Sequence, residues 1–97
     1  CIATTDTIHD PHDLQIRATI RREGQEVFSG QASSSQMARK CEDLSDWLQR
    51  SNVVPDMTVV LTGTAIVPKP GFPLQEGDIV AIEIEDIGRL ENDVVVV

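Results

Sequence analysis

The sequence predicts an α+β fold that is mainly β, and three observations support this. Apolar and polar residues alternate in residues 14–21 and again in residues 77–85, which is typical of strands with one buried face. Between them, apolar residues recur at helical spacing from Met37 to Leu48, which predicts one amphipathic helix. Aromatic residues make up only 3% of the chain, so the core depends on Ile, Val and Leu, and this favours sheet.

Residues 14–21 are expected to form the first strand of a hairpin. Residues 22–25 make the turn, with Gly24 at the position that needs a positive φ, and residues 26–29 return as the second strand. Residues 2–5 also have the composition of a strand, and a turn around Pro11 follows them.

The polar loop of residues 30–35 leads into the predicted helix, and two interpretations of it stay open. Ser34 or Ser35 can act as the helix N-cap, or the hydroxyl groups can form a rim beside a functional site. On the helix, Cys41 falls on the apolar side, so we expect a packed thiol and not a nucleophile.

The second half of the chain contains a Thr-Gly-Thr motif, Thr62-Gly63-Thr64. It follows residues 57–61, which are predicted to form a strand, and it precedes a loop with three prolines. Gly63 allows a positive φ or the close approach of a ligand, and the threonine hydroxyls can bond to a carboxylate or keto oxygen. A plain turn at the end of a strand is the alternative. Residues 94–97 are expected to form a last, buried or pairing strand.

Two groups of residues have the spacing of metal ligands, but the structural interpretation is favoured for both. His9 and His12 lie among aspartates, yet Pro11 between them makes a common ligand geometry hard to arrange, so solvated turn residues are expected. Glu83 and Glu85 share one strand face, which metal sites use and which solvated strand faces show more often.

Composition excludes some classes of partner. With 16 acidic and 8 basic residues the net charge is −8, which argues against binding to nucleic acid or to an anionic membrane. Two cysteines do not make a disulfide framework, no apolar run reaches the roughly 18–20 residues of a spanning helix, and no signal-peptide pattern is present. We therefore expect a cytoplasmic protein. Since the chain begins at Cys1 with strand-like residues, we expect one domain, residues 1–97, that is a portion of a longer chain.

Taken together in order, the motifs resemble the carboxyl-terminal signature of the fumarylacetoacetate hydrolase family. The resemblance extends over essentially all 97 residues. It is carried by Asp10-Pro11-His12-Asp13-Leu14-x-Ile16, the loop from Gln31 to Met37 with its helix, Leu61-Thr62-Gly63-Thr64, Leu74-x-x-Gly77-Asp78-x-Val80, and Ile84-x-x-Ile87-Gly88-x-Leu90-x-Asn92-x-Val94.

This resemblance implies a mixed β-roll and a hydrolase or lyase of 2-keto acids. Such enzymes use a divalent metal, usually Mg²⁺, which chelates the keto-acid end of the substrate and polarises its carbonyl. They are usually dimeric or larger, so a homo-oligomer is expected. The resemblance assigns a substrate-binding role to Thr64 and, more weakly, to Gly63, Ser33 and Ser34.

Two departures from the family pattern bear on activity. The family's metal ligands and catalytic lysine lie upstream of this segment, so we expect no catalytic or metal-binding residue here, no activity from the chain alone, and a missing amino-terminal part of the domain as its partner. The motif continues as Ala65-Ile66-Val67-Pro68 and lacks the Gly-Val-Gly of many acylpyruvate hydrolases. This resembles the branch that dehydrates 2-keto-3-deoxy sugar acids more than the branch that cleaves C–C bonds of acylpyruvates.

A different class of function is also compatible with the sequence. A small, acidic, β-rich domain could bind a partner or dimerise through residues 94–97 without any catalytic activity. Such a domain would fold cooperatively by itself.

Overall fold

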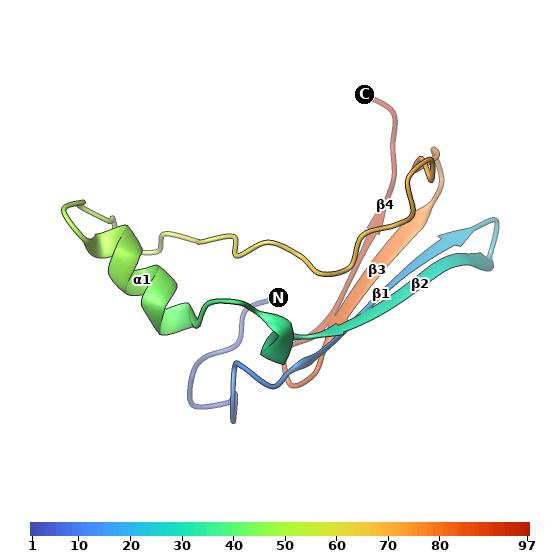
Figure 1. Ribbon diagram of the computed structural model, residues 1–97. Helices are drawn as coiled ribbons and strands as arrows, with labels where there is room; N and C mark the ends of the chain where they lie inside the picture. Colours follow the sequence, from blue (N-terminus) through green and yellow to red (C-terminus); the bar gives the residue numbers. More distant parts are fainter.

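A four-stranded antiparallel sheet forms the body of the chain in the computed structural model, which describes residues 1–97 (Figure 1). The strands are β1 (Gln15–Arg22), β2 (Gln25–Ser33), β3 (Ile79–Ile84) and β4 (Gly88–Asp93), and their order in the sheet is β2-β1-β3-β4. A 3₁₀ turn, η1 (Ser34–Gln36), and one helix, α1 (Cys41–Gln49), come between β2 and β3. These elements confirm the predicted α+β class with a predominance of sheet.

The predicted hairpin is formed by β1 and β2. Its two-residue turn consists of Glu23 and Gly24, with φ angles of 51° and 79°, and positive φ at both positions matches the twist of antiparallel strands. The second strand is longer than predicted, because it continues through Gly30 to Ser33 opposite Gln15.

The pairing of β1 with β3 gives the sheet one apolar face. Directly opposed residues point to the same side of an antiparallel sheet, so matching apolar pairs build a continuous surface. The pairs are Ile16 with Ile84, Ala18 with Ile82, and Ile20 with Val80, and β4 adds Leu90 opposite Ile82.

The opposite face carries ion pairs within β4 and between β4 and the strands β1 and β3. Glu91 on β4 accepts from Arg21 at 2.9 Å and from Arg89 at 2.6 Å. Glu83 on β3 lies 3.8 Å from Arg89. All four side chains are more than a third exposed, so these pairs contribute little to stability.

The long segment between α1 and β3 covers part of the apolar face. Phe72 packs against Phe28 of β2 with ring centroids 6.1 Å apart, and Ile66 lies over Gly30. The rest of this face is open, because Ile82 and Leu90 remain 40% and 47% exposed. Only three apolar residues are buried, namely Leu14, Ile20 and Ala81, and Ala81 lies on the opposite face of the sheet, so the core is small.

Helix α1 stands apart from the sheet (Figure 1). None of its residues is buried, and Trp47 is 63% exposed beneath the guanidinium of Arg50, 4.3 Å from its ring centre. The radius of gyration is 15.9 Å, compared with about 13 Å for a compact domain of this size, so much apolar surface faces solvent. No helix combines the length and apolar character needed to cross a membrane.

Three strand predictions were wrong. Residues 57–61 pair with no other strand, and Met57 lies in a turn with a φ of 63°; residues 2–5 form no strand. Of residues 94–97 only Val94 makes backbone hydrogen bonds, with Gly77 and Asp78, while Val95, Val96 and Val97 are exposed. A strand needs a neighbour for its backbone groups, and the described residues offer none to these segments.

The helix differs from its prediction at its start. Ser33 caps η1 and not α1, since its hydroxyl accepts from the N–H of Ser35. The N-cap residue of α1 is Lys40, which makes no side-chain capping bond, so neither Ser34 nor Ser35 caps this helix. Met37 precedes α1, which is consequently shorter than the periodicity predicts.

Candidate substrate site

The Thr62-Gly63-Thr64 motif lies in the long segment between α1 and β3, and its backbone is open to solvent. Gly63 has φ of +96°, a value that L side chains rarely adopt, and no heavy atom lies within 4 Å of the position of a β-carbon there. The glycine is therefore required by its backbone conformation and not by crowding. This agrees with the predicted conformation at Gly63, while its contact with a substrate stays a prediction.

The hydroxyl of Thr64 is held within a local turn. It accepts from the N–H of Ile66 at 3.1 Å, and its proton points toward the carbonyl of the same residue at 3.4 Å. The second contact is long and weak, so the hydroxyl keeps capacity for a further partner. Its neighbour Ile66 is anchored on the sheet, and this fixes the turn that carries Thr64.

Ser33 and Ser34 lie at the end of β2 and have different surroundings. Ser34 is buried, and its hydroxyl accepts from the N–H of Leu14 at 2.8 Å, while its own N–H donates to the Leu14 carbonyl. The Ser33 hydroxyl lies 2.8 Å from that of Ser35 and caps η1. Both hydroxyls are thus engaged in local structure, and this favours the structural interpretation of the loop.

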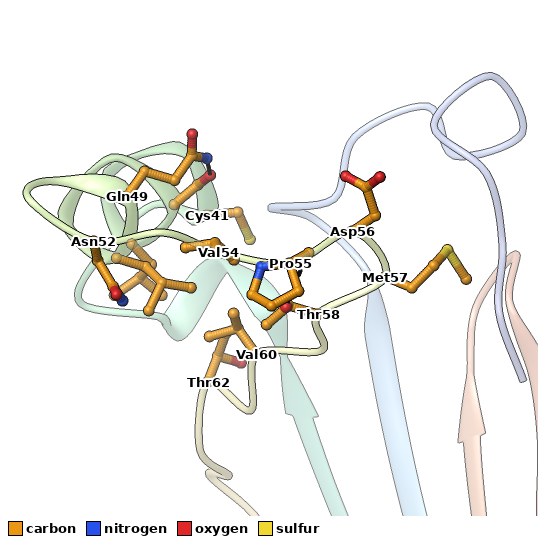
Figure 2. Close-up of a pocket in the computed structure, with 13 residues that line it drawn as sticks. Cys41, Gln49, Asn52, Val54, Pro55, Asp56, Met57, Thr58, Val60 and Thr62 are labelled. Carbon is orange, nitrogen blue, oxygen red and sulfur yellow. Dashed lines mark hydrogen bonds between the residues drawn. The ribbon is translucent and has the colours of Figure 1, made fainter.

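A hollow of about 640 Å³ lies between α1 and residues 54–62 (Figure 2). Cys41, Leu44 and Leu48 line it from the helix, and Val60 and Thr62 line it from the extended segment. Cys41 is half-buried there, in agreement with its predicted place on the apolar side. Thr64, Gly63, Ser33 and Ser34 do not line this hollow, so the structure does not gather the predicted substrate residues into one pocket.

Two of the four candidate metal ligands, His12 and Glu85, contact protein groups. Nε2 of His12 lies 3.1 Å from the Glu42 carboxylate, and Glu85 accepts from the N–H of Gln15 at 3.2 Å. A backbone hydrogen bond and the contact with His12 lower the pKa of Glu42. No group of three or more His, Cys, Asp or Glu side chains could hold a metal ion in these 97 residues. The residues present therefore do not fit a magnesium site.

A buried ion pair beside the proline-rich loop was missed by the sequence interpretation. The Asp78 carboxylate has no exposed surface and accepts from Nε and Nη2 of Arg22 at 2.7 and 2.8 Å. It also accepts from the N–H of Gln75, while Arg22 donates to the carbonyl of Pro73. The hydrogen bonds from Arg22, followed by that from Gln75, lower the pKa of Asp78 to about 2. One signal was available, namely an aspartate directly before an apolar strand, which needs a cation once it is buried.

Residues 1–95 match the family model described as fumarylacetoacetate (FAA) hydrolase C-terminal. Because the match covers nearly the whole chain, this protein belongs to the fumarylacetoacetate hydrolase family, within its carboxyl-terminal region. The predicted family, and the fold that it implies, are confirmed.

The relatives in this family are enzymes. A probable 2-keto-3-deoxyxylonate dehydratase of Haloferax volcanii is 43% identical over the whole chain, which corresponds to 34% of that protein. A 2-dehydro-3-deoxy-D-arabinonate dehydratase of Saccharolobus solfataricus is 44% identical over 92% of this chain and 30% of its own. A mitochondrial oxaloacetate tautomerase of Homo sapiens is 38% identical over 97% of this chain and 30% of its own.

Solved structures agree with these sequence matches. A 2-keto-3-deoxy-D-arabinonate dehydratase complexed with magnesium and 2,5-dioxopentanoate superposes with a TM-score of 0.89 at 42% identity. The overlap includes 94% of this chain and 32% of that one. The apo form of 2-keto-3-deoxy-D-arabinonate dehydratase gives a TM-score of 0.88. The chain thus spans about a third of the length of its relatives.

Proposed function

We propose that these residues are the carboxyl-terminal part of a Mg²⁺-dependent enzyme that dehydrates a 2-keto-3-deoxy sugar acid. One observation carries the proposal: identity to the two sugar-acid dehydratases is 43% and 44%, above the 38% found for the human tautomerase. The magnesium in the related dehydratase complex supports the choice of metal. Loss of one water from a five-carbon acid of this type leaves 2,5-dioxopentanoate, the compound in that complex.

Under this proposal, the chain contributes substrate contacts and the remaining polypeptide contributes the metal ligands. The absence of a three-ligand cluster here supports this division. The metal would bind the keto-acid end of the substrate and draw charge from its carbonyl. No step of that chemistry is assigned to residues 1–97. The isolated chain is accordingly expected to be inactive.

Thr64 is the first choice for a substrate contact. Its hydroxyl retains bonding capacity, its turn is anchored by Ile66, and the adjacent Gly63 leaves the backbone accessible. A hydroxyl in this setting can donate to a carboxylate or keto oxygen. We assign Ser33 and Ser34 a secondary role, in which they hold the loop in place beside the substrate.

The experiment is an activity assay on the full-length polypeptide that contains residues 1–97. The purified protein is incubated with Mg²⁺ and, separately, with a 2-keto-3-deoxy-pentonate, an acylpyruvate and oxaloacetate, and products are identified by NMR. We expect an aldehyde-bearing dioxo acid from the first compound only, and no product after the metal is removed with EDTA. Cleavage of the acylpyruvate alone would assign the hydrolase branch, and enol–keto exchange of oxaloacetate alone would assign a tautomerase. Either result would overturn the dehydratase proposal.

A further inference from the structure

The run of residues 57–68 is uncharged and rich in apolar side chains. A quarter of the chain is charged, yet no charged residue occurs between Asp56 and Lys69. Near-continuous apolar runs are typical of strands that are covered on both faces. In this structure the run is instead exposed: Met57, Val59 and Leu61 have exposed fractions of 90%, 79% and 91%.

Part of this run already has the geometry of a strand. Thr58, Val60 and Thr62 line the hollow beside α1, as alternate residues of an extended chain do (Figure 2). Val59 and Leu61 alternate with them and are the more exposed set, at 79% and 91%, since Val60 is 47% exposed. One face of the extended segment is therefore turned toward the helix, and the other has no cover.

The backbone of the same segment lacks partners. No hydrogen bond joins residues 59–63 to another backbone group or to a side chain. The four strands of the sheet satisfy one another without this segment. Residues that are extended, apolar and unpaired at the backbone present the requirements for β-strand addition.

From these features we infer that residues 58–62 pair with a β-strand supplied by the part of the polypeptide that corresponds to the other two thirds of the relatives. This rests on the proposed function, which assigns that part to the same enzyme. The relatives are about three times longer than this chain, so the region outside the match is large enough to supply a neighbour. Because Thr62 ends this segment and Thr64 follows it, the added strand would bring the metal-bearing part of the enzyme next to the candidate substrate contacts.

Amide hydrogen exchange in the full-length polypeptide tests the pairing. We expect the amides of residues 59–61 that face the added strand, which are alternate residues, to exchange at least about a hundredfold more slowly than those of the exposed Val95, Val96 and Val97. The paired amides of β1 serve as the positive reference. Exchange of residues 59–61 as fast as that of the tail would overturn the inference.

Cross-strand nuclear Overhauser effects then identify the neighbouring strand. In a uniformly labelled sample, contacts from residues 59–61 are expected to lead to residues outside the 97-residue match. A mixture of labelled and unlabelled protein reports contacts between molecules. If residues 59–61 show such intermolecular contacts, they pair with a second copy, and this would also overturn the inference. Neither measurement depends on catalysis, so an inactive enzyme with a protected segment would contradict the proposed function alone.

Substitution of Val59 provides an independent readout. Val59→Lys places a charge on the exposed apolar side of residues 58–62, which the added part of the polypeptide would cover. We expect the full-length protein to melt several degrees lower. Val59→Ile keeps the apolar, β-branched side chain and should melt within about two degrees of the wild type. Equal melting temperatures for Lys and Ile would show that position 59 remains exposed, against the inference.

Discussion

Asp78, at the start of β3, and Arg22, at the end of β1, form a two-pronged ion pair whose carboxylate has no contact with solvent. The same two side chains hold Pro73 and Gln75 of the proline-rich loop. The N–H of Gly77 donates to the carbonyl of Val94, and the N–H of Val94 donates to the carbonyl of Asp78, so backbone bonds join this point to the end of β4. One buried pair thus fastens two strands and the loop after the Thr-Gly-Thr motif.

Loss of this pair is expected to destabilise the protein strongly. Asp78→Asn keeps the shape of the side chain but leaves the Arg22 cation without its counter-charge, so the melting temperature should fall by more than about 10 °C. The measurement is thermal unfolding followed by circular dichroism. Glu91→Gln, which weakens the exposed pairs with Arg21 and Arg89, is the matched control and should lower the melting temperature only slightly.

The same pair predicts how stability depends on pH. The pKa of Asp78 is about 2 in the folded protein, below the value of about 4 for an unfolded chain, so the folded state gains stability from the ionised carboxylate. That contribution is complete above pH 4 and is lost as the pH falls through 2. Denaturant midpoints measured from pH 5 to pH 2 should therefore decline.

Asp78→Asn isolates the contribution of the Asp78 carboxylate to stability, because the asparagine side chain cannot ionise. Its denaturant midpoint should decline less steeply over the same interval than that of the wild type. Glu91 also has a lowered pKa, chiefly from its hydrogen bond with Arg89, so some acid dependence should remain in this variant. Parallel curves for the variant and the wild type would count against the role of Asp78.

Gly30 is expected to be intolerant of a side chain because Ile66 occupies the space above it. A β-carbon at position 30 would lie 2.5 Å from Cγ2 of Ile66 and 3.1 Å from Cζ of Phe28. Gly30→Ala should therefore cost about 1–3 kcal/mol in urea unfolding, as overpacking does. In the double variant with Ile66→Ala the clash disappears, so the two changes should be less than additive. Simple additivity would show that Ile66 does not rest on Gly30.

Ser34 distinguishes a structural serine from a substrate contact. Ser34→Ala leaves the N–H of Leu14 without its side-chain acceptor, and we expect a loss of about 1–3 kcal/mol of stability. Ser35→Ala is a control, because that residue is exposed and bonds only within its own turn. A stable Ser34→Ala variant with reduced affinity for the keto acid would instead support direct substrate binding.

Thr64 is expected to affect catalysis more than folding. In the full-length enzyme, Thr64→Val removes the hydroxyl and should reduce kcat/KM at least about tenfold, since a hydrogen bond to a charged substrate group is lost. Thr64→Ser keeps the hydroxyl and should retain most of the activity. Melting temperatures of both variants should stay near that of the wild type, because position 64 is exposed. Full activity of Thr64→Val would remove it from the substrate site.

Local patterns were sufficient to predict three of the four strands of the sheet but not β4, and they wrongly predicted strands in segments that lack a neighbour here. The hairpin and β3 were predictable because alternation and Gly24 act within a few residues of sequence. β4 was not predicted as a strand, since Arg89, Glu91 and Asp93 lie on one side and only Leu90 supplies an apolar contact on the other. Residues 57–61 have the composition of a strand, but composition does not provide a partner for the backbone.

The Thr-Gly-Thr motif of the candidate site could be predicted from the sequence, but the long-range contacts that hold it in place could not. The positive φ of Gly63 follows from its residue type, whereas the anchoring of Thr64 through Ile66 depends on a glycine 36 positions away. The pairing of Arg22 with Asp78 likewise joins residues 56 positions apart. Such contacts become visible only when the order of the strands is known.

The contact between Ile66 and Gly30 affects how the loop that carries Thr64 responds to temperature. Residues 59–68 make no backbone bond to the sheet, so the Thr64 loop is held through the apolar side chains of Ile66 and Phe72. Apolar contacts weaken on cooling, while hydrogen bonds do not share that dependence. We therefore expect the Thr64 loop to loosen in the cold before the sheet does, and substrate affinity to decline at low temperature in a protein that is still folded.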